Sequence, residues 1–206
     1  MATLKALLAS PDKSVRLQAA LAAGTYPEDQ FIEILISQCA IEADFFVRDT
    51  LSWALMRHDV EKVVERLQTE LISENPQAKS QALHTLTKIA DKKNYPLITR
   101  EHLLSSHDKV AVTAWRAASV LVPENEKPAL TDILVTQLGR GNSDVQFDLT
   151  RFMCALGDCI VAPLTEAINS TKEEISLHAK FTLMRYEEMK LETSKTRTVG
   201  GEGFDL

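Results

Sequence analysis

The sequence predicts an all-α fold, a right-handed α-α superhelix built from about six helical hairpins. The first observation is composition, because 7 Gly and 7 Pro in 206 residues are too few for the many tight turns of an all-β chain. Leu, Ala, Glu, Lys and Gln, which favour helices, dominate instead. The second observation is a set of aligned apolar columns that recurs six times along the chain. Together these features predict a repeat protein without sheets.

Each repeat is marked by a small or aliphatic residue at the start of a helix, with apolar residues four and eight positions later. The first column reads Val15, Val47, Ala78, Val110, Val145 and Ile175, at intervals of 32, 31, 32, 35 and 30 residues. The column four positions later reads Ala19, Leu51, Ala82, Ala114, Leu149 and Ala179. The column eight positions later reads Ala23, Leu55, Leu86, Ala118, Met153 and Leu183. These positions form one stripe of a helix, which we expect each repeat to bury against its neighbours.

Helix-starting residues stand three positions before the first column, where a side-chain oxygen can accept a hydrogen bond from a first-turn amide. They are Asp12, Asp44, Asn75 and Asn142. A second amphipathic segment precedes each of these helices. The first helices of the hairpins are predicted near 2–9, 28–40, 60–72, 95–105, 127–138 and 161–169. The second helices are predicted near 14–23, 45–57, 76–90, 109–121, 144–157 and 173–191.

These elements place a single repeat domain over residues 1–191. The last stretch, 192–206, is polar, contains glycine and lacks the periodicity, so we expect a disordered tail there.

The first ten residues, the apolar runs and the number of cysteines predict the cellular compartment. Met1 to Ser10 has neither the basic region nor the apolar core of a signal peptide. No apolar run approaches the roughly 20 residues that span a bilayer. Three cysteines are an odd number and too few for a disulfide framework. A reducing cytoplasm is therefore expected.

Patterns for catalysis or for metal binding are missing. The five histidines include no pair four residues apart and are expected to be solvated or hydrogen-bonded surface residues. Gly139 and Gly141 form no phosphate-binding motif and are typical of a helix C-terminus. We expect no catalytic residue, no metal and no cofactor, and hence not an enzyme.

A strip of cationic and aromatic side chains along the second helices is the candidate binding site. In helical solenoids the second helices line the concave face, so such residues can form a groove for a protein or peptide partner. The candidates are Arg48, Trp53, His84, Trp115, Arg116 and Arg151. The alternative for each Trp is that it is consumed by the core between repeats.

The position after the first column is basic in the first three repeats, with Arg16, Arg48 and Lys79. In one reading these residues form a basic stripe that attracts an acidic partner. In the other, Arg16 pairs with Asp12 and Arg48 with Asp44, four residues apart, and the pairs brace the helix and the neighbouring turn.

The segment from Ser10 to Ala20, SPDKSVRLQAA, resembles the PBS-lyase-type HEAT repeats that are widespread in bacteria. The segments FVRDTLSWAL, SQALHTL and TAWRAA, which begin at Phe46, Ser80 and Thr113, resemble a family of small bacterial HEAT-repeat proteins. Members of that family occur alone or joined to a MerR-type DNA-binding domain. The resemblance covers about residues 4–185 and implies a HEAT-like solenoid with no assigned activity.

A second resemblance concerns Phe46 to Arg48 followed by Trp53 to Leu55. This stretch is similar to one in the HEAT-like alkylpurine DNA glycosylases, which read the DNA backbone from a basic concave face. Their catalytic Asp and DNA-contacting Arg set find no match in this sequence. The net charge of -6 also argues against a general nucleic-acid binder, which carries a basic excess.

Three functions stay open from the sequence. The first is a non-catalytic interaction or scaffold module whose concave face binds a protein or peptide. The second is a small-ligand sensor or regulatory protein. The third is a HEAT-like DNA-repair protein. The sequence favours the first, with no membrane association, and does not identify the partner.

Overall fold

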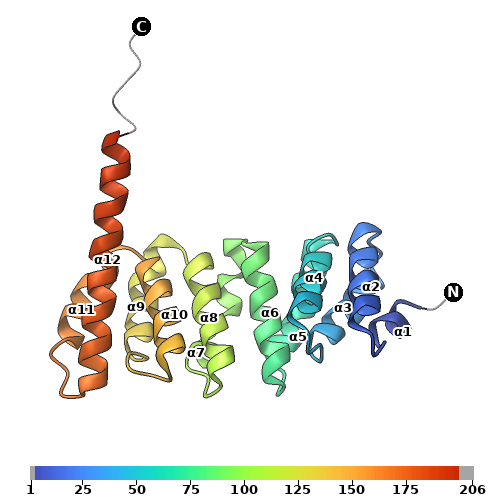
Figure 1. The fold of residues 1–206 in the computed structure, drawn as a ribbon, viewed down its shortest axis with the longest axis horizontal. Coiled ribbons are helices and arrows are strands. Elements are labelled where there is room, and N and C mark those ends of the chain that lie inside the picture. Colours follow the sequence, from blue (N-terminus) through green and yellow to red (C-terminus); the bar gives the residue numbers. More distant parts are fainter. Residues whose placement is uncertain (1–2, 200–206) are drawn as a thin grey trace, which may run out of the picture. The chain divides into compact units, whose positions relative to one another are not determined.

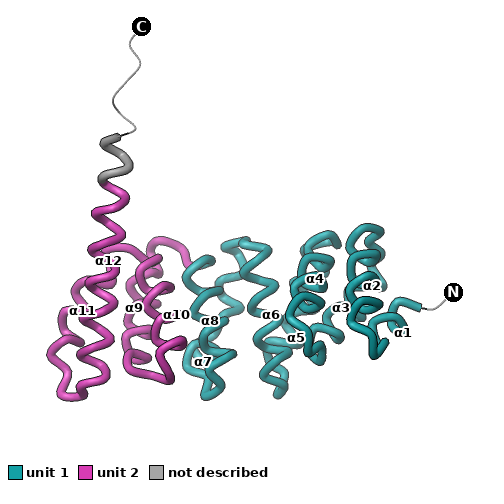
Figure 2. Tube along the Cα trace, viewed as in Figure 1, with its two compact units in different colours: residues 1–121 teal, residues 122–206 magenta. Residues whose placement is uncertain are grey.

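The computed structural model describes residues 3–199. The backbone forms two compact units, unit 1 over Met1–Leu121 and unit 2 over Val122–Leu206 (Figure 2). In both units the described chain is helical and contains no β-strand. The predicted all-α fold of helical hairpins is therefore confirmed within each unit.

Unit 1 contains four hairpins (Figure 1). Its first helices are α1 (Leu4–Leu8), α3 (Phe31–Cys39), α5 (Val60–Leu71) and α7 (Arg100–Leu103). Its second helices are α2 (Lys13–Thr25), α4 (Phe45–Leu55), α6 (Pro76–Ile89) and α8 (Asp108–Leu121). Each second helix packs on the next, α2 on α4, α4 on α6 and α6 on α8, while α1 packs on α3 and α3 on α5. Unit 1 therefore has a layer of first helices and a layer of second helices.

The predicted helix starts are set by side-chain caps. Asp12, Asp44, Asn75 and Asn142 each accept a hydrogen bond from a first-turn amide of the helix that follows. Such caps satisfy amides that have no partner inside the helix. Pro76 occupies the first turn of α6, where its missing N–H leaves no hydrogen bond unmade.

The apolar columns face the interior, as the sequence predicted. Every member of the column four residues after the first is at most 4% exposed: Ala19, Leu51, Ala82, Ala114, Leu149 and Ala179. In the column eight residues after the first, the members up to Met153 are also buried. Because four of the six residues in the column four positions after the first are alanines, the helix backbones can approach closely at these positions.

One predicted helix is divided. The segment expected near 95–105 consists of a 3₁₀ helix, η1 (Lys92–Leu97), followed by α7. Pro96 lies inside η1, and proline both lacks the N–H and disfavours an α-helical residue before it. A new α-helix therefore begins only at Arg100, with Thr99 as its N-cap.

Unit 2 contains two hairpins and two short 3₁₀ turns. The helices are α9 (Lys127–Val135), α10 (Ser143–Cys154), α11 (Val161–Ala167) and α12 (Glu173–Val199), and the turns are η2 (Glu124–Glu126) and η3 (Asp158–Ile160). Helix α12 continues past residue 191, where the sequence predicted the repeat domain to end. Residues 192–199 contain no Gly or Pro to interrupt the helix. The rest of the predicted tail, 200–206, lies outside the described residues.

The length and polarity of the helices bear on membrane insertion. Among residues 3–199, no helix combines the length and the apolar character needed to cross a bilayer.

Candidate functional site

A hollow of about 230 Å³ lies on the second helices of unit 1. Helices α4, α6 and α8 contribute its walls, and no residue of a first helix takes part. Its charged and aromatic lining residues are Phe45, Arg48, Asp49, His84, Lys109 and Arg116. Three of the six sequence-predicted binding residues, Arg48, His84 and Arg116, are thus brought together.

Helical periodicity explains why His84 and Arg116 share one face. The buried stripe is centred about 40° round the helix from the first column, at about 100° per residue. His84 and Arg116 stand six positions after Ala78 and Val110, which is about 240° round the helix and almost opposite the stripe. The residues that fix the packing of α6 and α8 therefore leave these two side chains on the other face.

The hollow carries more positive than negative charge. Its one acidic lining residue, Asp49, accepts a hydrogen bond from Lys88 at 2.5 Å, and this bond holds the pKa of the Asp49 carboxyl below its ordinary value. Within the described part of the chain, neither the Lys109 ammonium nor the Arg116 guanidinium has a hydrogen-bond or ion-pair partner. The positive charge of the hollow is therefore only partly compensated.

Burial and the neighbouring positive charges shift the pKa of two groups at the hollow. Partial burial and the charge of Arg48 lower the pKa of Lys109. Burial, followed by the charges of Lys88 and Arg116, lowers the pKa of His84, although its Nε2 lies 3.7 Å from Asp49 Oδ1. Both groups lose protons more readily, first because burial disfavours the charged form and then because neighbouring cations repel it.

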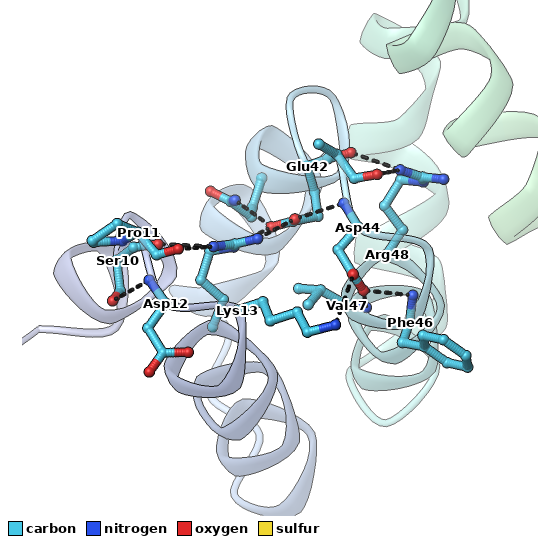
Figure 3. Close-up of polar contacts among 12 residues, drawn as sticks. Ser10, Pro11, Asp12, Lys13, Glu42, Asp44, Phe46, Val47 and Arg48 are labelled. Carbon is cyan, nitrogen blue, oxygen red and sulfur yellow. Dashed lines mark hydrogen bonds and ion pairs between the residues drawn. The ribbon is translucent and has the colours of Figure 1, made fainter.

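Arg48 also has a structural contact. Its Nη1 donates to the backbone carbonyls of Glu42 and Ala43, at 2.9 and 2.6 Å (Figure 3). Arg16 repeats the pattern in the previous hairpin by donating to the carbonyls of Ser10 and Pro11. These arginines brace the turn before their helix through its backbone, rather than through the predicted pairs with Asp12 and Asp44, whose carboxylates cap helices.

Glu42 links the first two hairpins of unit 1 through hydrogen bonds. Its carboxylate, on a residue that is 2% exposed, accepts from Nε and Nη2 of Arg16, both at 2.8 Å. It also accepts from the Gln38 side-chain amide and the Asp44 backbone amide. Burial by itself would raise the pKa of Glu42, but these hydrogen bonds outweigh it and hold that pKa below its ordinary value.

The two tryptophans do not line the hollow. Trp115 is fully buried, and its Nε1 donates to the carbonyl of Leu103 at 2.8 Å, so its prediction as a surface residue was wrong. It stands one position before Arg116, which turns it by about 100° toward the layer of first helices. Trp53 is half-buried and packs against Gly24 of α2.

The corresponding face of unit 2 has a different chemistry. Phe147, Leu177 and Phe181 line a hollow of about 460 Å³ between α10 and α12. Arg151 lies on α10 of this unit, where its guanidinium pairs with Asp148 at 3.1 Å and stands over the Phe152 ring. Arg151 is therefore described with unit 2 and is no part of the hollow on α4, α6 and α8.

Three histidines are core residues rather than the expected surface residues: His58, His102 and His178 are 7%, 5% and 4% exposed. The Thr99 amide donates to Nδ1 of His102, and Nε2 of His102 lies 2.9 Å from the carbonyl of Leu71. Because Nδ1 accepts, Nε2 carries the hydrogen and donates. His102 thus ties α7 to the end of α5.

The three cysteines are free thiols at separate positions in the described chain. Cys39 and Cys154 are buried, Cys159 is half-buried and all three are free thiols. Burial raises the pKa of the Cys39 thiol to about 12, which keeps it protonated at neutral pH. In the described range, no group of three His, Cys, Asp or Glu side chains is placed to hold a metal ion.

Sequence reasoning missed three charged or aromatic residues of the hollow: Phe45, Asp49 and Lys109. Phe45, which is 65% exposed, stacks edge-to-face on Phe46, which is 69% exposed. Lys109 precedes the first-column residue Val110 by one position, about 260° round the helix and on the same face as Arg116. A search of all positions on the face opposite the buried stripe, rather than of one column, would have included these residues.

Comparisons with known proteins show similarity in fold. No family model matches the chain, and no curated protein sequence matches it. The crystal structure of an engineered protein is 17% identical, with a TM-score of 0.47, over 91% of this chain and 100% of that chain. The complex of CpcE and CpcF of phycocyanin lyase from Nostoc sp. PCC7120 is 17% identical, with a TM-score of 0.36, over 90% of this chain and 95% of that chain.

Proposed function

We propose that the chain is a non-catalytic interaction module that binds a protein or peptide partner through the second-helix layer of unit 1. The observation that carries this proposal is the hollow at which Arg48, His84 and Arg116 meet beside the exposed ring of Phe45. Arginine and aromatic residues dominate binding hot spots because they combine a large contact area with directed hydrogen bonds. The free thiols support an action in the reducing cytoplasm.

The size of the hollow favours this function over small-ligand sensing. Pockets for small molecules occupy about 300–1,000 Å³, are largely apolar and enclose most of the ligand. The hollow holds about 230 Å³, which is below this range. It suits single side chains that project from a larger partner.

The test is site-specific photo-crosslinking in the native host, with p-benzoylphenylalanine in place of Phe45. The control carries the same group at Ile72, which is 78% exposed and follows α5 in the other helix layer. We expect position 45 to yield protein adducts that position 72 does not yield, and Arg116→Ala to diminish them. Adducts that are the same from both positions, or that are insensitive to Arg116→Ala, would contradict the proposal.

A further inference from the structure

We infer that the hollow on α4, α6 and α8 receives the carboxylate side chains of an acidic peptide segment, with an apolar side chain of that segment packed on Phe45. The inference rests on the proposed function and names the chemistry of the partner.

The unpaired cations are the first support. Arg116 and Lys109 lie about two turns apart on α8, line the same hollow and have no side-chain partner among the residues that the structure describes. A guanidinium presents a planar fork that matches a carboxylate with two hydrogen bonds. Burial is the main reason that the pKa values of Lys109 and His84 are lowered, and neighbouring positive charges add to it; a carboxylate placed here would offset those charges.

The aromatic edge of the hollow is the second support. Phe45 lines the hollow while remaining 65% exposed, and Phe46 supports its ring at a centroid distance of 5.6 Å. Exposed aromatic rings of this size provide apolar contact area next to the cations. A segment that combines acidic residues with a leucine or a phenylalanine matches both features at once.

The charge of the rest of the molecule favours a peptide over a nucleic acid. The chain carries a net charge of -6, which repels a long polyanion outside the hollow. Asp49 also lies within the hollow, so a continuous row of phosphates would meet a carboxylate. A peptide can place its acidic residues only at Lys109 and Arg116 and a neutral residue beside Asp49.

The experiment is a titration of a peptide into the full chain, in which binding is measured by calorimetry and by changes in backbone amide chemical shifts. The probe is a short peptide of glutamates with one central phenylalanine. The matched peptide has glutamine at every glutamate, and a single-stranded oligonucleotide tests the polyanion alternative. The variants are Arg116→Gln and Lys109→Gln, with Lys93→Gln as the control because Lys93 is exposed on η1, outside the hollow.

We expect the glutamate peptide to bind and the glutamine peptide not to bind. Arg116→Gln and Lys109→Gln should each weaken binding about tenfold, which corresponds to the smaller free energies found for hydrogen bonds to charged groups. Lys93→Gln should leave the affinity unchanged. Amide shifts should be confined to α4, α6 and α8. Absence of binding, equal binding of the glutamine peptide or stronger binding of the oligonucleotide would overturn the inference.

The two proposals can fail separately. If position 45 yields adducts that depend on Arg116 but the glutamate peptide does not bind, the acidic chemistry is wrong and the interaction module stands. If the specific adducts and the peptide binding are both absent, both proposals fall.

Discussion

Substitution of Gly24 tests how closely the first two second helices approach. A Cβ atom on Gly24 would lie 2.3 Å from Cζ3 of Trp53 and 2.9 Å from the Cα atom of Ala54. In an unobstructed helix, Gly→Ala stabilises by about 1 kcal/mol. Here the second contact is with backbone, so the strain can be relieved only if α2 and α4 move apart. Overpacking near the upper end of its range costs about 3 kcal/mol, and we therefore expect Gly24→Ala to lose about 2 kcal/mol net.

The assay is urea unfolding followed by tryptophan fluorescence. Both tryptophans of the chain, Trp53 and Trp115, lie in unit 1, so their emission follows that unit without a contribution from unit 2. We expect Gly24→Ala to lower the urea concentration at the unfolding midpoint. The dependence of the free energy of unfolding on urea concentration should change little, because it reflects the surface exposed on unfolding.

A double-mutant cycle identifies the cause. Trp53→Leu removes the ring atoms closest to the new Cβ but leaves the contact with Ala54, so Gly24→Ala should cost less in the Trp53→Leu background without becoming stabilising. If Gly24→Ala raises the stability of the wild-type chain, helix propensity exceeds the steric term and the close approach of α2 and α4 is incorrect. If the cost is equal in both backgrounds, Trp53 is not the obstacle.

Three further predictions concern the core of unit 1. Glu42→Ala should destabilise by about 3 kcal/mol in chemical denaturation, because the partners of a buried carboxylate lose their acceptor. Since the folded pKa of Glu42 is lowered, its stabilisation is present above about pH 4.3 and is lost as the pH falls through the folded pKa. In that acid range, Glu42→Gln should therefore make the free energy of unfolding depend less on pH. A pH dependence equal to that of the wild type would contradict this. Trp115→Phe should cost about 2–4 kcal/mol, since it leaves the Leu103 carbonyl without its donor and removes part of a buried ring; a melting temperature equal to that of the wild type would refute the core position. Ala114→Gln should cost about 2–4 kcal/mol through overpacking and a buried amide, and a wild-type urea midpoint would show that the repeat register is wrong.

The hairpins were predictable because their signals are local. A cap such as Asp44 acts on amides two and three residues away, and a stripe such as Val47, Leu51 and Leu55 lies on one side of a single helix. Neither signal depends on the position of another segment. The prediction was wrong at Pro96. The apolar pattern predicted a continuous helix there, and the backbone restriction of proline divides it.

The candidate site was predictable only in part. The sequence predicted that Arg48, His84 and Arg116 contribute to one surface, and the structure gathers them at one hollow. The columns did not reveal that Arg48 also binds the preceding turn, or that Lys109 joins the same surface. Those facts depend on which backbone and which neighbouring helix each side chain meets.

By itself, the sequence determined the helical class, the six hairpins, the capped helix starts and the buried stripe, because these follow from helix periodicity and first-turn hydrogen bonding. Only the tertiary structure decided whether each large or charged side chain is buried, paired or exposed. Trp53 and Trp115 are the same residue type on equivalent helices, yet one packs on Gly24 and the other is buried with its N–H on a carbonyl. The physical reason is that burial, pairing and pKa depend on atoms contributed by other helices, at distances of a few ångströms that one-dimensional spacing does not specify.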